Sequence, residues 1–366
     1  MPTRVLILSA GIGEGHDLPA RMLSDGLARL EPGIDAPVVD GLAAMGKMST
    51  LLADDGSDFM FEKANWLFDF SYLLLARFPP TRAFARWLTH RLGTRGLTRL
   101  IAEWQPDVIV STYPGVTEVL GHLRAKGRIL VPVVSAITDL AGLRYWVHPG
   151  VDVHLITEPE SVDEVRSIAP GTRVVCVRGL TSAGFEEVVT QADARELLGL
   201  PRDGSLIVVS GGGWAVGDLR GAARAALGAD AEATVVVLCG RSDDKRAALD
   251  REFAGEPRLR TMGFTDQMPA LFAAADVLIH STAGLTVFEA RLRGCRVISY
   301  GWGVAHIRLN NSAYQRFGLA RVVTDAPGLH DALRAALAEP RVSGTEAYAA
   351  RPSAAAEVLA LAGARP

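Results

Sequence analysis

The stretch Val5-Leu-Ile-Leu-Ser9, followed by Ala10-Gly-Ile-Gly-Glu-Gly-His16, decides the fold. A short apolar run that ends in a glycine loop predicts a buried parallel strand, and the pattern over 19–30 predicts a helix after it. The arrangement returns far along the chain, where Leu206-Ile-Val-Val-Ser210 precedes Gly211-Gly-Gly-Trp-Ala-Val-Gly217 and an Ala- and Arg-rich helix. Two copies of strand, glycine loop and helix predict two doubly wound α/β domains.

Further apolar runs alternate with helical patterns, which is typical of parallel sheets covered on both faces. They are Val108–Ser111, Val131–Ile137, Val153–Ile156, Val174–Val177, Thr234–Leu238, Val277–Ile279 and Val297–Tyr300. We expect an N-terminal Rossmann-like domain over 1–180 and a C-terminal one over 181–344, with the two facing a cleft. The helical end, 345–366, is expected to pack back on the first domain.

Composition narrows the class of protein. The chain has 366 residues, of which 49% are hydrophobic and 22% charged, so sizeable cores are expected and disorder is excluded. A net charge of −3 excludes a globally basic nucleic-acid binder. Cys176, Cys239 and Cys295 are far apart and form no C-x-x-C pair, which favours a reducing compartment. With no apolar stretch of bilayer length and no signal peptide, we expect a cytoplasmic enzyme.

The glycine loops are candidate phosphate sites, because backbone N–H groups there can approach phosphate oxygens. Each loop alone is weak evidence, since a tight turn also serves packing. The first loop, with Gly13 and Gly15, reads G-x-G-x-G-H and departs from the dinucleotide fingerprint, so a dehydrogenase is disfavoured. The second loop contributes Gly211, Gly212 and Gly213.

A third loop, Ser281-Thr-Ala-Gly-Leu-Thr286, follows the strand that ends at His280 and precedes a helix over Val287–Arg293. Thr286 at the N-cap and Glu289 at N3 would form a capping box, which needs no ligand. Alternatively, the amides bind a diphosphate and Glu289 accepts hydrogen bonds from ribose hydroxyls. The spacing alone favours the capping box.

This loop, together with Gly263-Phe-Thr-Asp-Gln-Met268, Ala275-Asp276 and Gly294, resembles the donor-binding half of GT-B glycosyltransferases. The most similar families are the peptidoglycan lipid-intermediate N-acetylglucosaminyltransferases and the monogalactosyldiacylglycerol synthases with the processive diacylglycerol glucosyltransferases. Ser111-Thr-Tyr-Pro114 and Thr138-Asp139 resemble the diacylglycerol branch more closely.

The resemblance implies a GT-B fold and a role for each matching residue. It places uracil at the backbone of Phe264, ribose at Glu289, and the general base at His16 with Asp139 nearby. It places the phosphates at Ala283, Gly284, Leu285, Thr286, Gly211, Gly212 and Gly213. The family's sugar-contacting Gly-Gln-Glu-x-x-Asn reads Ala305-His-Ile-Arg-Leu-Asn310 here, which keeps Asn310 but has His306 and Ile307 in place of the polar Gln-Glu pair.

The chemistry of transfer needs a base for the acceptor hydroxyl and a partner for the departing diphosphate. His16 suits the first task because histidine titrates near neutrality, although a histidine at a helix start can also merely face solvent. The chain has no Asp-x-Asp pair, so we expect metal-independent, inverting transfer with a UDP-sugar as co-substrate and no cofactor.

The stretch from Phe70 to Ala102 holds six arginines and no acidic residue. Helical spacing puts Phe84, Trp87 and Leu88 on one face and Arg82 and Arg86 on the opposite one, with a helix break expected near Leu92–Gly93. A basic, aromatic surface suits an anionic membrane, whereas an ordinary core helix with solvated arginines is the plainer alternative. The predicted membrane contacts are Arg82, Arg86, Trp87, Arg91 and Arg95. No nucleic-acid module accompanies them.

The sequence therefore predicts a hexosyltransferase that acts on a diacylglycerol-like lipid and associates peripherally with the inner face of the cell membrane. A second hypothesis replaces the lipid with a soluble secondary-metabolite acceptor, and a third is a nucleotide-sugar epimerase of the same fold. A nucleotide-binding module without turnover is a fourth, for which the altered segment at His306 is the best support.

Overall fold

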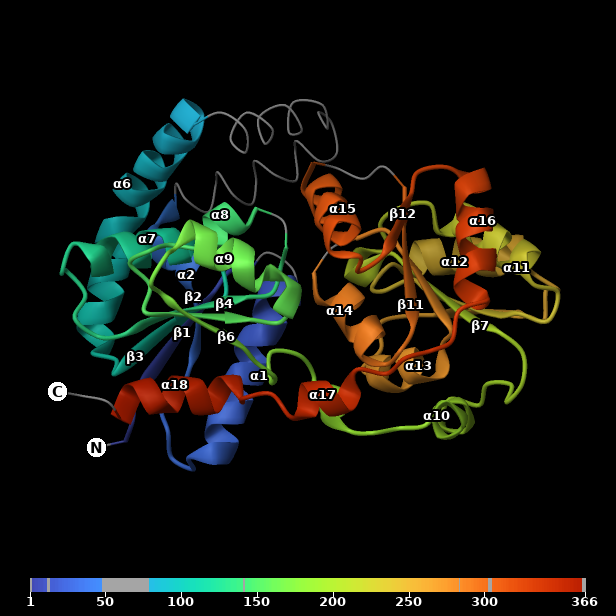
Figure 1. Cartoon of the computed structure of the whole chain (residues 1–366), viewed down its shortest axis with the longest axis horizontal. Coiled ribbons are helices and arrows are strands. Elements are labelled where there is room, and N and C mark those ends of the chain that lie inside the picture. The colour runs from blue at the N-terminus through green and yellow to red at the C-terminus, as the bar shows by residue number, and fades with distance from the viewer. Residues whose placement is uncertain are drawn as a thin grey trace. The chain divides into compact units, whose positions relative to one another are not determined.

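The computed structural model describes residues 2–11, 14–47, 79–140, 142–282, 284–301 and 305–363. It divides into two units, Met1–Thr181 with Arg351–Pro366, and Ser182–Ala350 (Figure 1). Each unit contains a six-stranded parallel sheet. The two doubly wound units predicted from the glycine loops are therefore present.

The first sheet has the order β2-β1-β3-β4-β5-β6. Because β1 lies between β2 and β3, the strand order reverses at the β1/β3 boundary, where Val5 pairs with Val108. Strands β1, β3, β4 and β5 are buried along their whole length, which explains their continuous apolar sequences. The strands are β1 (Val5–Ser9), β2 (Val38–Asp40), β3 (Val108–Ser111), β4 (Val133–Ile137), β5 (Val153–Ile156) and β6 (Arg173–Cys176).

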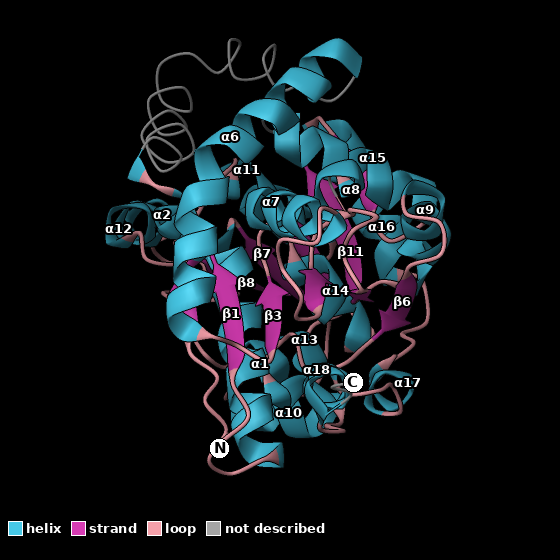
Figure 2. Cartoon of the chain, turned by 90° about the vertical axis from the view of Figure 1, so that its left-hand side faces the viewer, coloured by secondary structure: helices cyan, strands magenta, loops and turns pink. Residues whose placement is uncertain are grey.

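Helices cover both faces of this sheet. Val5 and Ile7 point toward α1 and α18, and the alternate residues Leu6 and Leu8 point toward α2, α6 and α7. The terminal helix α18 thus completes the core of the first unit, as Figure 2 lets the reader follow. The helices are α1 (Glu14–Leu30), α2 (Gly41–Met45), α6 (Pro79–Trp104), α7 (Pro114–Ala125), α8 (Leu143–Trp146), η1 (Pro159–Ser161), α9 (Val162–Ile168) and α18 (Ala354–Gly363).

The second sheet has the order β12-β11-β10-β7-β8-β9, so its strand order reverses between β7 and β10. Helices α11 and α16 bury one face of it. The strands are β7 (Leu206–Ser210), β8 (Thr234–Leu238), β9 (Leu259–Met262), β10 (Val277–His280), β11 (Arg296–Tyr300) and β12 (Arg321–Val323). The helices are η2 (Ala183–Glu186), α10 (Gln191–Leu197), η3 (Gly212–Trp214), α11 (Leu219–Ala229), α12 (Asp243–Glu252), α13 (Met268–Ala274), α14 (Leu285–Leu292), α15 (Ala305–Phe317), α16 (Ala326–Leu337) and α17 (Thr345–Ala349).

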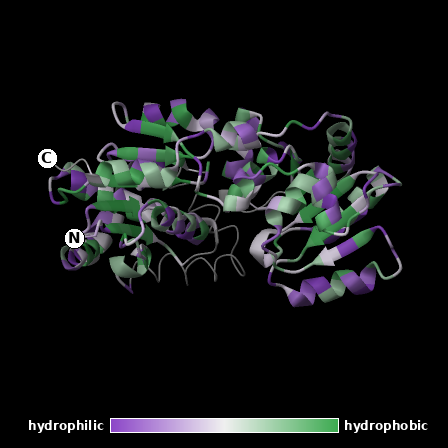
Figure 3. Cartoon of the chain, turned by 90° about the horizontal axis from the view of Figure 1, so that it is seen from below, coloured by the Kyte–Doolittle hydropathy of each residue, from purple (hydrophilic) through white to green (hydrophobic). Residues whose placement is uncertain are grey.

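Departures from the expected elements concentrate at edges and helix starts. The apolar runs marked as strands all form strands, whereas β2, β9 and β12 were missed, because these edge strands are short and only partly buried. Figure 3 shows the apolar strands between more hydrophilic helices. Helix α1 begins at Glu14, before the predicted start at residue 19, and it contains Pro19. Helix α18 lies in the first unit, as expected for 345–366, whereas α17 lies in the second.

The predicted break near Leu92–Gly93 is wrong, because α6 runs unbroken from Pro79 to Trp104. Its glycines serve helix packing instead of ending the helix. A Cβ on Gly93 would lie 2.6 Å from Cε of Met45, and one on Gly96 would overlap the backbone oxygen of Ala44. The two glycines therefore let α2 approach the α6 backbone closely.

We predict that Gly96→Ala destabilises the protein by about 1–3 kcal/mol, because the added methyl group meets backbone atoms that cannot rotate away. Urea unfolding measures this change. Gly228→Ala is the matched control, since Gly228 is also helical but has open space around it. The control is expected to be neutral or stabilising by up to about 1 kcal/mol. Equal unfolding free energies for the two variants would contradict the close approach of α2.

Acid is expected to destabilise the first unit through His154. Burial lowers the pKa of His154 to about 4, helped by the nearby His148, whereas the unfolded chain titrates near its ordinary value of 6.5. The unfolded state therefore binds more protons as the pH falls from about 6.5 toward 4, and stability is lost across that window. At pH 5 the loss from His154 is about 2 kcal/mol.

Urea unfolding at pH 7 and pH 5 tests this prediction. His154→Gln should show a smaller difference between the two pH values than the unsubstituted protein. His330, whose side chain is 43% exposed, provides the control, and His330→Gln should leave the difference unchanged. A pH dependence unaffected by His154→Gln would contradict the assignment.

Candidate functional site

His16 lies in the first turn of α1, directly after the loop that follows β1. Its Nδ1 is 3.0 Å from the carbonyl oxygen of Thr112, which follows β3. Because a carbonyl only accepts hydrogen bonds, Nδ1 carries the proton and the neutral ring has its lone pair on Nε2. Since β1 and β3 flank the reversal of strand order, His16 lies where doubly wound sheets bind ligands.

Aromatic rings hold the imidazole of His16 in place. Its centroid is 5.1 Å from the ring of Tyr113 and 5.7 Å from that of the buried Trp146. Burial, with a contribution from Asp40, raises the pKa of Tyr113, so this ring stays neutral beside His16. Nothing in the local sequence pattern of Tyr113 or Trp146 indicates contact with His16.

The loop around His16 is fixed by polar contacts from neighbouring strands. Ser9 donates from Oγ to Oδ1 of Asp17 at 2.5 Å, and Thr138 donates from Oγ1 to the carbonyl of Gly15 at 3.4 Å. Thr138 and Asp139 follow β4, so this second contact brings the segment of Asp139 to the loop of His16. Gly15 is exposed, and Gly13 lies outside the described residues.

In the second unit, two candidate loops emerge side by side at the reversal between β7 and β10, where Ser210 pairs with His280. Gly212 has φ +67°, and a Cβ there would lie 3.2 Å from Cγ2 of Thr282. Gly217 has φ +93°, and a Cβ there would overlap Ser281. These glycines are thus required by the close packing of the two loops.

Neighbouring side chains secure the Gly211–Gly217 loop. Lys245 of α12 donates from Nζ to the carbonyl of Ala215 at 2.7 Å. The Arg241 amide donates to the carbonyl of Gly213 at 2.8 Å. The loop therefore has a lysine and an arginine beside it. Sequence reasoning missed both, because they lie on separate segments without a motif.

The predicted capping box at Thr286 and Glu289 is wrong. Helix α14 starts at Leu285, and its N-cap is Gly284, with φ +89° and no side-chain cap. Thr286 therefore lies inside the first turn and Glu289 in the second, where it is 7% exposed. Glu289 is consequently a buried carboxylate that lies beyond the N3 position a capping box requires. Ala283 lies outside the described residues.

Phe264 follows β9 and is 57% exposed. The guanidinium carbon of Arg241 lies 4.0 Å from the centre of its ring, a cation–π geometry. Because Arg241 also bonds to Gly213, this pair joins Phe264 to the glycine loop. The arrangement offers a flat, positively charged surface at the carboxyl edge of the sheet.

Helix α15 follows β11 and carries the altered sugar-contacting segment. Asn310 is fully buried, and its neighbour Asn311 accepts a 2.6 Å hydrogen bond from Ser299. Asn311, which the sequence analysis did not single out, thus ties the helix to β11. The side chain of His306 lies outside the described residues.

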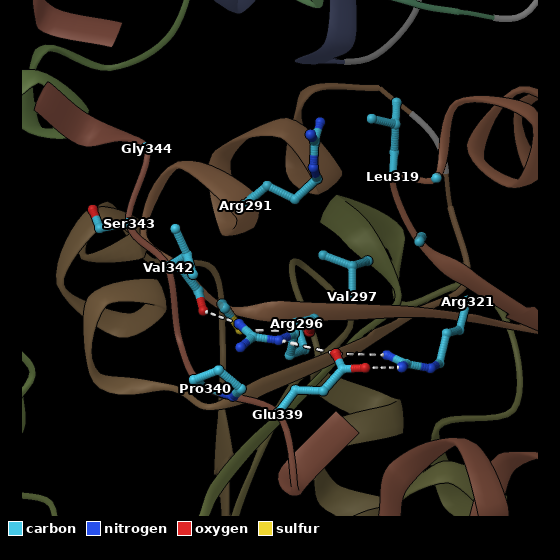
Figure 4. Close-up of a pocket in the computed structure, with 14 residues that line it drawn as sticks. Arg291, Arg296, Val297, Leu319, Arg321, Glu339, Pro340, Val342, Ser343 and Gly344 are labelled. Atoms are coloured by element: carbon cyan, nitrogen blue, oxygen red, sulfur yellow. Dashed lines mark hydrogen bonds and ion pairs between the residues drawn. The ribbon is translucent and has the colours of Figure 1, made fainter. Parts of the chain in front are cut away.

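A cavity of about 730 Å³ in the second unit lies apart from these loops (Figure 4). It borders Arg296, the first residue of β11, whereas the candidate site follows the carboxyl ends of the strands. Glu339 accepts hydrogen bonds from Arg296 and Arg321, each at 3.3 Å, so the Glu339 carboxylate is paired with two guanidinium groups. This cavity does not belong to the candidate donor site.

The aromatic and basic residues on α6 separate into two groups. Phe84 and Trp87 are 61% and 54% exposed and stack with ring centres 5.7 Å apart. Arg91 and Arg95 are exposed as well. Arg86 instead donates from Nε to the buried Glu118 at 2.7 Å. None of the described helices is long and apolar enough to cross a bilayer.

The comparisons of this chain with known proteins agree with one another. Residues 42–180 match the family model described as monogalactosyldiacylglycerol (MGDG) synthase. The chain is 25% identical over 328 residues to a processive diacylglycerol beta-glucosyltransferase of Bacillus pumilus, covering 87% of this chain and 83% of the relative. It is 24% identical over 344 residues to the protein of that name from Bacillus subtilis, covering 92% and 87%.

Among solved structures, Acinetobacter baumannii MurG is similar with a TM-score of 0.54 and 14% identity, covering 95% of this chain and 98% of MurG. The likeness to MurG concerns the fold, and the predicted GT-B fold is confirmed.

Proposed function

We propose that this chain, a glycosyltransferase of the GT-B fold, transfers a hexose from a UDP-sugar to the hydroxyl of a diacylglycerol-like lipid. The observation that carries the proposal is the orientation of His16, whose Nδ1 lies 3.0 Å from the carbonyl oxygen of Thr112. Because a carbonyl accepts the Nδ1 proton, Nε2 is the nitrogen that would take the substrate proton. The relatives named above supply the acceptor class, since their printed name is processive diacylglycerol beta-glucosyltransferase.

The reaction is a single displacement. The acceptor hydroxyl oxygen forms a bond to the anomeric carbon while the bond from that carbon to the UDP phosphate oxygen breaks. The hydroxyl proton passes to Nε2 of His16, and the bonding electron pair leaves with UDP. One displacement at the anomeric carbon inverts its configuration. Asp139 belongs to the segment that adjoins the His16 loop and would stabilise the imidazolium.

The donor would bind at the carboxyl edge of the second sheet. Amides of Gly211–Gly213 and of Gly284–Thr286 would face the diphosphate, with α14 adding the positive end of its dipole. Glu289 would accept hydrogen bonds from the ribose, and uracil would lie against Phe264. His306 and Asn310 of α15 would contact the sugar.

Fixed amides would stabilise the departing charge in this scheme without a metal ion. Two positive charges lie close by, since Lys245 bonds to the loop through Nζ and a guanidinium nitrogen of Arg241 lies 3.4 Å from where a Cβ on Gly213 would be. The chain would act from the inner face of the cell membrane, where the exposed Phe84–Trp87 pair and the arginines of α6 meet the lipid surface.

UDP release from a panel of UDP-sugars, with and without diacylglycerol in vesicles, tests the proposal. We expect release that depends on diacylglycerol and is unchanged by EDTA. Loss of activity in EDTA with recovery in magnesium would overturn metal independence. Release without any acceptor would favour an epimerase or hydrolase, and release that needs a soluble aglycone would favour the secondary-metabolite enzyme.

A further inference from the structure

Three buried polar side chains form a row across the central strands of the second sheet, at or next to the strands' carboxyl ends. Strand β7 ends at Ser210 and β10 at His280, and the register pairs His280 with Ser210 on one side and with Ser299 of β11 on the other. Register partners in a parallel sheet point to the same face. The alternate residue Ile279 belongs to the core under α11 and α16, so the row points away from that core.

The two serines of this row each fix a segment that follows their own strand. The amide of Gly212 donates to Oγ of Ser210 at 3.2 Å, which holds the first turn of the glycine loop after β7. Oγ of Ser299 donates to Oδ1 of Asn311 at 2.6 Å, which ties α15 to β11. Both segments belong to the proposed donor site, since the glycine loop would face the diphosphate and α15 would contact the sugar.

His280, in the middle of the row, fixes the loop that follows β10. The backbone amide of Thr282 donates to Nδ1 of His280 at 3.3 Å. Since Nδ1 is the acceptor, the neutral imidazole carries its proton on Nε2. Burial lowers the pKa of His280 to about 4, so Nδ1 keeps its lone pair at neutral pH. The imidazole also packs against Tyr314 of α15, with ring centres 6.0 Å apart.

Thr282 is the point where the two proposed diphosphate loops meet. Its side chain lies against Gly212, where a Cβ would be 3.2 Å from Cγ2 of Thr282, and its amide is held by His280. Further along the same loop, Gly284 has φ +89° and, among the residues that the structure describes, open space where a Cβ would lie. Packing on that side does not constrain Gly284, so we expect the hydrogen bond at Thr282 to orient the loop.

We propose that His280 is a positioning residue of the donor site, whose Nδ1 holds the loop of Thr282 in the geometry that receives the diphosphate. The inference rests on the proposed function, and it adds a residue that acts through the loop instead of touching the donor. A fully buried imidazole suits this task, because a hydrogen bond is stronger where water is excluded. Uracil and ribose would meet Phe264 and Glu289, so loss of this hydrogen bond should weaken the diphosphate contacts above all.

Two substitutions of similar shape separate the hydrogen bond from packing. His280→Asn keeps an acceptor, since Oδ1 of asparagine lies at the place of Nδ1, whereas His280→Leu has the same branching and no acceptor. We expect His280→Leu to raise the Kd for UDP by about three- to tenfold, the effect of one hydrogen bond, and His280→Asn to stay within about twofold of the unsubstituted protein. The Kd for uridine, which lacks the diphosphate, should change by less than about twofold in both variants. Urea unfolding of the two variants checks that both are folded.

Equal Kd values for UDP in the two variants would overturn the positioning role of His280 and leave the proposed function intact. Equal losses of affinity for UDP and uridine in His280→Leu would do the same, because they would indicate a general disturbance of the second unit. Hydrogen exchange of residues 281–286 gives a readout without nucleotide, and we expect faster exchange in His280→Leu than in His280→Asn. An unsubstituted protein that does not bind UDP would overturn the proposed function, whereas the exchange rates would still decide whether Nδ1 of His280 holds the loop.

Discussion

Replacing His16 by alanine is expected to lower kcat by about 10²–10⁴-fold, the range for a general base. The Nδ1–H of His16 donates to the Thr112 carbonyl, so the ring is held with Nε2 as its basic nitrogen. Alanine removes the proton acceptor without touching the second unit, where the donor is proposed to bind. UDP affinity, measured by calorimetry, should therefore stay within about twofold of the unsubstituted value.

His330→Ala is the matched control, since this half-buried histidine lies on α16 of the second unit. Its turnover should equal that of the unsubstituted protein. If His16→Ala kept its kcat, His16 would be a helix-start histidine without a catalytic role. If UDP affinity were retained and turnover lost, as expected, a nucleotide-binding module without turnover would be excluded.

Glu289→Gln is expected to raise the Kd for UDP by about 10–100-fold, because a carboxylate accepts two hydrogen bonds from a vicinal diol and an amide oxygen replaces it poorly. A hydrogen bond to a charged group contributes about 1.5–3 kcal/mol, which corresponds to that range. The change preserves the shape of the side chain, so the unfolding free energy should change much less than the affinity for UDP.

Glu346→Gln is the control, since Glu346 is an exposed acidic residue of α17 in the same unit. UDP binding by calorimetry and urea unfolding should both be measured for the two variants. Loss of stability in Glu289→Gln with an unchanged Kd for UDP would show that the carboxylate has a structural role instead of contacting the ribose.

The sequence predicted the two sheets well, because buried parallel strands are continuous apolar runs and glycine loops mark where they end. It erred where a residue's role depends on its neighbours in space. Thr286 and Glu289 have the spacing of a capping box, yet α14 begins earlier, at Leu285. Gly93 marks a break in the linear pattern, yet it provides the clearance that α2 needs against a continuous α6.

The sequence by itself determined the repeated strand–loop–helix units and the arginine-rich stretch, since both follow from the order of residues along one segment. Only the tertiary structure decided what the side chains contact. His16 gains its tautomer from Thr112, and Arg86 turns inward to Glu118 from a helix whose Trp87 faces outward. Such contacts join residues from different strands and helices, which come together only when the sheet forms. The local sequence pattern therefore carries no information about them.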